Sequence, residues 1–295
     1  MNKVVCFGEV LWDVFPDGKV IGGAPLNVAL RLQSQGHEVA MISKLGKDGA
    51  GERAYDYIEE KGLPTIGIQW DETLATGEVL ITINDKGSAS YVITEPVAWD
   101  AIELTDIVLD VVAESSIFVF GSLVCRRPES KKTLSELMAL AHFSVFDVNL
   151  RPPFYTMELL QELMRRSDFV KLNDEELVEV IHDLGITSNT LKEGGEALIK
   201  QFNLKGICVT EGAEGAFLFW NGQFYDHPGY GVQVKDTVGA GDSFLATLIG
   251  ELFVKQRDPK VALDRACAVG ALVASKVGAN CVVRESELEM LVLNS

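Results

Sequence analysis

The chain has 295 residues, of which 47% are hydrophobic, and its formal net charge is −17 at pH 7. This length suits one large α/β domain, and the apolar content is sufficient for a buried core. The negative charge repels phosphate backbones and anionic lipids, so we expect neither nucleic acid nor a membrane surface as a partner.

Short β-branched or aromatic runs alternate with longer amphipathic stretches along the chain. The short runs predict strands at 3–7, 38–43, 116–120, 144–148, 168–172, 206–210 and 216–220. The amphipathic stretches predict helices at 27–35, 51–61, 131–142, 157–166, 175–183, 195–203, 243–255, 260–275 and 285–293. Continuously apolar strands that alternate with helices are typical of a doubly wound α/β fold, in which helices cover both faces of a mostly parallel sheet. We therefore expect residues 1–295 to form a single domain.

Two segments interrupt this alternation and have the pattern of hairpins. In LWDVFPDGKVIGG, strand-like residues flank the turn at 16–18, and in EVLITINDKGSASYVI they flank a turn at 84–87. Two isolated hairpins cannot form a core, so we expect the segments around 11–22 and 76–93 to join in a small sheet that stands off the main one. Such a sheet suits a lid over a site or a dimer contact. Two plain surface hairpins are the alternative.

Apolar runs, the first ten residues and the cysteines indicate where in the cell the protein is located. No apolar run approaches the length of a bilayer span, and the first ten residues, MNKVVCFGEV, lack the basic and long apolar regions of a signal peptide. The five cysteines are widely scattered and include no Cys-x-x-Cys pair. We therefore expect reduced thiols, mostly in the core, and a cytoplasmic protein.

The segment KDTVGAGDSF, at 235–244, carries the clearest chemical signal. The preceding GVQV is strand-like and a helical pattern follows, so Gly239, Ala240 and Gly241 lie where free backbone N–H groups can hold an anion. The loop lacks the Lys-Ser/Thr ending of a Walker A motif and the third glycine of a dinucleotide fingerprint. It suits phosphoryl transfer, in which Asp242 takes the proton from an attacking hydroxyl. A plain N-capped helix is the alternative.

DTVGAGDSF resembles the C-terminal signature of the ribokinase-like, or phosphofructokinase B, family of sugar kinases. Residues 22–27, GGAPLN, followed by Ala29, Gly36 and Gly46, are similar to a second signature of that family. The two motifs occur in the right order and far apart, so the resemblance covers essentially the whole chain. It implies a doubly wound α/β domain with a small β-sheet lid. Within the family, GEVLWDVFP, FGSL, DVNLRPPF and PVAWDAI look most like fructokinases.

The resemblance implies roles for residues around the sugar. Asp242 matches the catalytic base, and Gly239, Ala240 and Gly241 match the anion hole. The residues that match or suit contacts with the sugar are Asp13, Gly23, Asn27, Asn149 and Arg151. A carboxylate suits this task because it accepts two hydroxyl hydrogen bonds at once. If the resemblance is set aside, Asp13 is an exposed residue beside a turn and Asn27 is a helix N-cap. Arg151 is then a solvated residue at the end of a strand.

The resemblance also implies nucleotide and metal sites, with Mg²⁺ and ATP as the cofactors. The residues implied at the nucleotide are Asn173, Thr210, Gly212, Gly215 and Asn280. Asn173 and Glu176 match an Asn-x-x-Glu motif in which the glutamate reaches magnesium through water, and the same spacing predicts a capping box. Asp236 opens the C-terminal signature, where many relatives bind K⁺. Its alternative role is to cap the turn through Thr237.

Together these features predict an ATP-dependent kinase that phosphorylates a primary hydroxyl of a small sugar, with fructose converted to fructose 6-phosphate. The enzymatic alternatives are 2-dehydro-3-deoxygluconate kinase and another sugar or nucleoside kinase of the family. A non-catalytic sugar-binding regulator on the same fold is a further alternative, against which Asp242 and the glycines beside it argue. The expected partners are the sugar, ATP and a second copy of the chain bound through the lid.

Overall fold

The computed structural model describes residues 3–83 and 89–293. Over these ranges, nine strands form one large sheet in the order β13-β12-β11-β10-β9-β8-β1-β4-β5. Neighbours from β11 to β5 pair in parallel, and β12 and β13 are antiparallel additions at one edge. In chain order the strands are β1 (Val4–Phe7), β4 (Val39–Gly46), β5 (Ile68–Asp71), β8 (Ile117–Gly121), β9 (Ser144–Asp147), β10 (Phe169–Asn173), β11 (Gly206–Thr210), β12 (Ala216–Trp220) and β13 (Gln223–His227).

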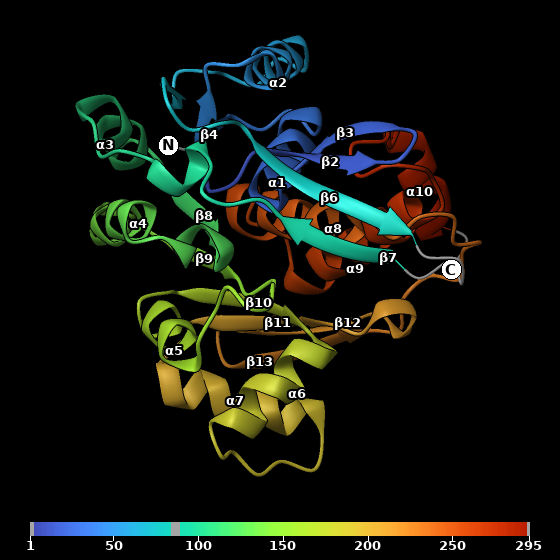
Figure 1. Ribbon diagram of the computed structural model, residues 1–295. Coiled ribbons are helices and arrows are strands. Elements are labelled where there is room, and N and C mark those ends of the chain that lie inside the picture. The colour runs from blue at the N-terminus through green and yellow to red at the C-terminus, as the bar shows by residue number, and fades with distance from the viewer. Residues whose placement is uncertain (1–2, 84–88, 294–295) are drawn as a thin grey trace.

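Helices cover both faces of this sheet (Figure 1), which explains why its central strands are continuously apolar. One face packs against α1 (Ala24–Ser34), α2 (Gly49–Glu60), α8 (Ala240–Leu248) and α9 (Pro259–Ala274), and α10 (Glu285–Leu293) lies on α9. The other face packs against α3 (Asp106–Ala113), α4 (Pro128–Leu140), α5 (Met157–Arg165), α6 (Asp174–Asp183) and α7 (Leu191–Phe202). The predicted doubly wound architecture is confirmed.

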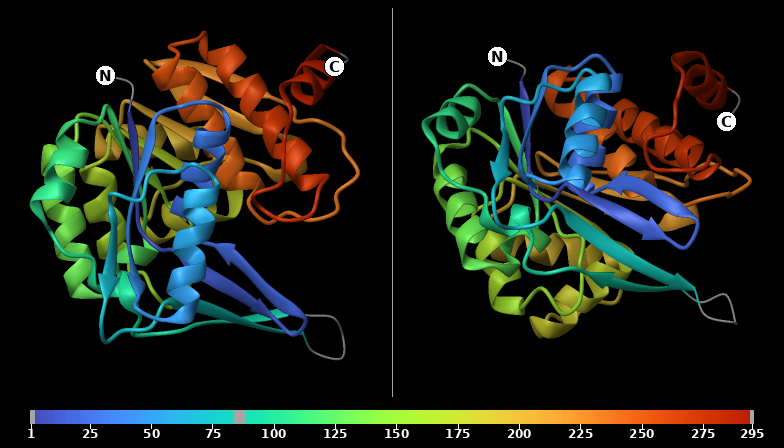
Figure 2. Two further views of the ribbon diagram at one scale, coloured as in Figure 1. Left: turned by 90° about the horizontal axis from the view of Figure 1, so that it is seen from above. Right: turned by 45° about the horizontal axis from the view of Figure 1, so that its top comes forward.

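The two predicted hairpins do join in one small sheet, of order β3-β2-β6-β7. Its strands are β2 (Leu11–Phe15), β3 (Gly18–Gly22), β6 (Gly77–Ile83) and β7 (Ala89–Ile93), and the two hairpins meet through the parallel pair β2 and β6. Figure 2 shows this sheet reaching out from the main body. The predicted turn at 84–87 lies outside the described residues.

Several details differ from the sequence prediction. The segment GVQV at 231–234 is not a strand, because no neighbouring strand pairs with it and Val234 is exposed. The predicted helix at 243–255 begins earlier, at Ala240, and its second half, Ile249–Val254, winds as a π-helix. The prediction missed β5 and β13, which are short edge strands with mixed polar composition, and it missed α3, whose DIVLDVVA reads as a β-branched run. Among the described residues, no helix is long and apolar enough to cross a membrane.

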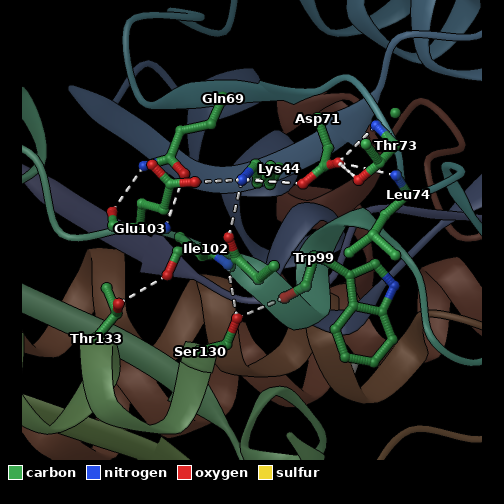
Figure 3. Close-up of polar contacts among 12 residues, drawn as sticks. Lys44, Gln69, Asp71, Thr73, Leu74, Trp99, Ile102, Glu103, Ser130 and Thr133 are labelled. Carbon is green, nitrogen blue, oxygen red and sulfur yellow. Dashed lines mark hydrogen bonds and ion pairs between the residues drawn. The ribbon is translucent and has the colours of Figure 1, made fainter. Parts of the chain in front are cut away.

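A buried lysine fixes the edge of the sheet where β5 ends. Lys44 Nζ on β4 donates to Asp71 Oδ2 at 3.0 Å, Glu103 Oε1 at 2.8 Å and the carbonyl of Ala101 at 3.1 Å (Figure 3). Three acceptors therefore match the three N–H groups of this ammonium, which leaves none of its donors without a partner. The Lys44 cluster joins β4, β5 and the chain beyond the short 3₁₀ helix Ala98–Ala101.

Asp48 fastens the small sheet to the main body. It is the N-cap of α2 and accepts hydrogen bonds from the amides of Ala50 and Gly51 at 3.0 and 2.7 Å. It also accepts from the backbone N–H and the hydroxyl of Thr76, at 2.8 and 2.9 Å, directly before β6 begins. A second tie is the indole N–H of Trp12 on β2, which donates to the carbonyl of Ala50 at 3.0 Å.

We expect Asp48→Ala to lower the free energy of unfolding by about 2 to 3 kcal/mol, because both the helix cap and the Thr76 hydrogen bonds are lost. The matched control is Thr190→Ala, which removes the N-cap hydrogen bond to Glu193 at an exposed helix start and should cost about 1 kcal/mol. Urea denaturation measures both values. Equal losses in the two variants would contradict a special role for the Thr76 contact.

Candidate active site

The predicted site residues gather where the strand order of the large sheet reverses. From β1 the chain goes to β4 on one side, and β8 later pairs with the other side of β1. In doubly wound sheets, ligands bind in the crevice beyond the carboxyl ends of the strands at such a point. Glu9 follows β1, Asp147 ends β9 and Asn173 ends β10, so three polar side chains meet at this edge.

The anion-hole segment forms the amino end of α8. Gly239 is the N-cap residue with a left-handed φ of 74°, and a Cβ there would overlap Ala279, so the position requires glycine. No side chain caps this end, and within the described residues the amides of Gly241 and Asp242 donate to no other group. A plain N-capped helix is therefore the wrong interpretation. The uncapped helix start can hold an anion.

Asp242 is held by a chain of two asparagines. Asn27 Nδ2 donates to Asp242 Oδ2 at 2.8 Å, and Asn280 Nδ2 donates to Asn27 Oδ1 at 3.1 Å. Asn27 lies inside α1, whose N-cap is Gly23, so the N-cap interpretation of Asn27 is also wrong. One turn further along α1, Arg31 donates to Ser243 Oγ at 3.1 Å and to the carbonyl of Cys281 at 2.9 Å. These contacts fix α1 against α8.

The environment of Asp242 makes it a weaker acid than usual. Burial and the nearby carboxylate of Asp147 raise the pKa of Asp242 to about 6, although the Asn27 hydrogen bond and nearby cations oppose the rise. A carboxylate with a pKa in this range is ionised at neutral pH and is a better proton acceptor than an exposed aspartate. The site thus contains one group suited to general base chemistry, next to an uncapped helix start.

Sequence reasoning missed three buried ionisable residues in this region. Glu9 is 3% exposed, its Oε2 has no hydrogen-bond partner within the described residues, and burial raises its pKa to about 7. Lys171 Nζ on β10 pairs with Asp147 Oδ1 on β9 at 3.1 Å, and both side chains are buried. The signal that could have revealed them is a charged residue inside or directly after an apolar strand, as in FVKLN and SVFD.

The candidate sugar-binding residues come from both sheets, and several of them lie near the same carboxylates. Asp13 lies on β2. Burial raises the pKa of Asp13 above its usual value, although the charge of Arg151 opposes the rise. The charge of Arg151 also acts on Glu9 and Asp242. Gly23 has a φ of 111°, and a Cβ there would overlap the carbonyl of Glu9. Asn149 adopts a φ of 40° just beyond β9. The structure therefore brings the small sheet and the main sheet together around one group of carboxylates.

Glu176 and Asn173 form the capping box of α6. Asn173 Oδ1 accepts from the amide of Glu176 at 2.7 Å, and Glu176 Oε2 accepts from the amide of Asn173 at 2.9 Å. The other oxygen of Glu176 accepts from the amide of Leu150 at 2.8 Å. Both oxygens are therefore used by backbone groups. Among the described residues, no group of three or more His, Cys, Asp and Glu side chains is arranged to hold a metal ion.

The other candidate nucleotide residues follow the edge of the sheet away from Asp242. Thr210 is the register partner of Asn173 in the adjacent strand. Gly212 and Gly215 take φ values of 58° and 93° in the turn to β12, whereas Asn280 lies beside Asn27, to which its side-chain amide donates. Asp236 stands apart from this group: its carboxylate accepts from the amides of Val238 and Gly278 at 3.0 and 2.9 Å. It thereby ties the loop before α8 to the loop after α9.

A large mixed sheet, a small sheet beside its ligand edge, and a carboxylate next to an uncapped helix start are the features expected of a kinase of small molecules. The chain matches the pfkB family carbohydrate kinase model over residues 1–285, and it therefore belongs to that family. The sugar kinase PH1459 of Pyrococcus horikoshii is 32% identical over 90% of this chain and 84% of its own length. Fructokinase of Escherichia coli is 28% identical over 94% of both chains.

Among solved structures, fructokinase from Xylella fastidiosa with bound ATP superposes with a TM-score of 0.87. It is 25% identical, and the match covers 99% of this chain and 98% of that one. The ribokinase-like fold expected from the sequence is thereby confirmed, including the second, smaller sheet. A hollow of about 610 Å³ between Phe143, Trp220 and Phe253 lies at the amino ends of β8 and β9 and includes none of the site residues.

The titration of Asp242 gives a direct check of the site geometry. We expect a pKa of about 6 in the free protein, so the carboxylate becomes protonated as the pH falls through that value. Asn27→Ala removes a hydrogen bond that favours the ionised form and should raise the pKa further. Carbon-13 NMR of labelled aspartate carboxyl groups measures both, and Asp242→Asn identifies the signal. A pKa below 4 in the wild type would contradict the enclosed geometry.

Proposed function

We propose that this carbohydrate kinase transfers the γ-phosphoryl group of ATP to a primary hydroxyl of fructose, giving fructose 6-phosphate. The observation that carries the proposal is the placement of Asp242, which Asn27 orients in the first turn of α8, where the amides of Gly241 and Asp242 are unbonded within the described residues. The similarity to the fructokinases of E. coli and X. fastidiosa supports fructose as the sugar. ATP as the donor is supported by the nucleotide named in the X. fastidiosa structure.

In the proposed reaction, the ionised Asp242 accepts the proton of the sugar hydroxyl. The hydroxyl oxygen attacks the γ-phosphorus, and ADP leaves. The backbone amides of Gly239, Ala240 and Gly241 form the anion hole that stabilises the charge on the transferred group. Asp13, on the small sheet, accepts hydrogen bonds from the sugar hydroxyls. The remaining sugar contacts come from Gly23, Asn27, Asn149 and Arg151, and the charge of Arg151 acts on Glu9, Asp13 and Asp242.

The small sheet acts as the lid of a single kinase domain spanning 1–295, with its hairpins around 11–22 and 76–93. The exposed apolar side chains of this small sheet include Val20 on β3, Leu80 on β6, and Tyr91 and Val92 on β7. Leu80 and Val92 are register partners on one face of this sheet, whereas Val20 and Tyr91 lie on its other face. These exposed apolar side chains support a homodimer formed through the lid, since burying them in an interface favours association. Light scattering across a range of protein concentrations tests the assembly.

Mg²⁺ bound together with ATP would neutralise charge on the phosphates. Because both oxygens of Glu176 accept backbone hydrogen bonds, we propose that this carboxylate reaches the ion only through water. Asn173, Thr210, Gly212, Gly215 and Asn280 border the nucleotide in this proposal. Their positions along the ends of β10 and β11 and beside α8 support an extended triphosphate site.

An ADP-release assay on a panel of sugars tests the function. We expect turnover with fructose, and Asp242→Asn should reduce kcat about a hundredfold or more because the general base is lost, while ATP still binds. The variant should remain folded, since it removes a buried charge next to Asp147. Turnover with 2-dehydro-3-deoxygluconate but not fructose would establish the alternative substrate. If no sugar on the panel leads to ADP release, the result would instead favour a regulatory protein.

K⁺ is proposed to bind beside the anion hole, near Asp236 and the loop at Gly278. The carboxylate of Asp236 already joins these two segments, and a bound cation would hold the adjacent amides in their anion-binding arrangement. We expect kcat to fall severalfold when K⁺ is replaced by tetramethylammonium at constant ionic strength. Equal rates in the two salts would show that the loop is ordered without an ion.

A further inference from the structure

Lys171 is an unusual residue for its position. It lies in β10, a parallel strand covered on both faces, and it is 6% exposed. Its ammonium pairs with Asp147 Oδ1 on the neighbouring strand at 3.1 Å. A buried ion pair loses much of its Coulomb energy to desolvation and is seldom more stable than apolar side chains of similar volume. The pair therefore invites a chemical explanation beyond holding β9 and β10 together.

A second buried lysine, Lys44, shows what a fully satisfied structural ammonium looks like in this protein. Figure 3 shows Lys44 with its acceptors on Asp71, Glu103 and the backbone, one for each N–H group. Lys171 has a single acceptor, Asp147, within the described residues. Two of its N–H groups are thus left for a partner that the protein itself does not supply. Buried donors without acceptors are costly unless a ligand satisfies them.

The position of the Lys171 ammonium identifies that partner. A methyl group built on Gly241 would stand 3.6 Å from Lys171 Nζ, so the ammonium lies directly beside the anion-hole turn. Burial lowers the pKa of Lys171, but the carboxylates of Asp147 and Glu176 outweigh this effect and hold the pKa above its usual value. A permanent cation with two unused donors therefore faces the same space as the unbonded amides of α8. Phosphate oxygens are the acceptors that suit such a group.

We propose that Lys171 is a catalytic residue that donates hydrogen bonds to oxygens of the phosphoryl group during its transfer, with Asp147 holding its ammonium in place. The inference rests on the proposed function. As the sugar oxygen bonds to the γ-phosphorus, the bond from phosphorus to the β,γ-bridging oxygen breaks, the hydroxyl proton passes to Asp242 and ADP leaves. Lys171 keeps its protons throughout and stabilises the negative charge carried by the transferred oxygens.

The competing explanation is that Lys171 only neutralises Asp147. Lys171→Met alone cannot separate the two, because it leaves the Asp147 carboxylate buried without a partner. The double variant Lys171→Met with Asp147→Asn removes both charges and the need for neutralisation. If Lys171 acts on the phosphoryl group, kcat of the double variant stays about a hundredfold or more below wild type. Recovery of kcat in the double variant would overturn the proposal.

Lys44→Met provides the matched control, because it breaks a lysine–aspartate pair of similar burial in the same sheet. Its midpoint of thermal unfolding should fall while kcat changes less than about threefold, since Lys44 lies in a cluster apart from the site residues. A loss of kcat in Lys44→Met as large as in the Lys171 variants would mean that general destabilisation explains both, and would also overturn the proposal.

Nucleotide binding tests the inference without any sugar. Isothermal titrations with Mg²⁺ should show that the double variant binds the β,γ-imido analogue of ATP at least tenfold more weakly than wild type, with ADP affinity almost unchanged. Equal weakening of both nucleotides, or of neither, would contradict a contact with the γ-phosphoryl group. If wild type phosphorylates no sugar, the proposed function fails, but this comparison still decides whether Lys171 binds the terminal phosphate.

Discussion

A single hydrogen bond, from Asn27 to Asp242, joins segments that lie 215 residues apart in the chain. It connects α1, the helix that follows the first hairpin, with α8, the helix that carries Asp242, and Arg31 reinforces the same junction through Ser243 and Cys281. The junction lies at the point where the strand order reverses. Because α1 and α8 are packed together there, the uncapped start of α8 has a fixed position, where a ligand can use its amides.

The electrostatics of the site follow from this crowding. Glu9, Asp147 and Asp242 converge in a chain that already carries a net charge of −17, yet the related fructokinase structure from X. fastidiosa holds ATP, which is an anion. Burial raises the pKa of Asp242, which favours base chemistry, but it also makes each unpaired carboxylate costly. Lys171 and Arg151 supply the opposing charge. A site of this kind depends on cations placed close to the phosphates, because the field of the whole protein repels them.

The sequence predicted the central strands well because they are long, apolar runs whose two faces are buried, so burial and propensity agree. It failed at β5 and β13, which lie at the edges of the sheet, where half-exposed residues such as Trp70 weaken the pattern. At 231–234 the sequence predicted a strand that does not form. The alternating Val232 and Val234 do not make a strand there because no neighbouring strand pairs with the segment. Edge pairing depends on tertiary neighbours that a local pattern does not contain.

By itself, the sequence determined the alternation of strands and helices, the two hairpins, and the two glycine-bearing motifs with the carboxylate at the end of the second. These features depend on local backbone freedom and on side-chain periodicity, which neighbouring residues specify. Only the tertiary structure decided that Asn27 is a partner of Asp242, that both oxygens of Glu176 are occupied, and that Lys171 faces Gly241 with two N–H groups unused. Such facts depend on how separate strands end at one edge of a sheet, and distances between those ends are set by packing of the whole domain.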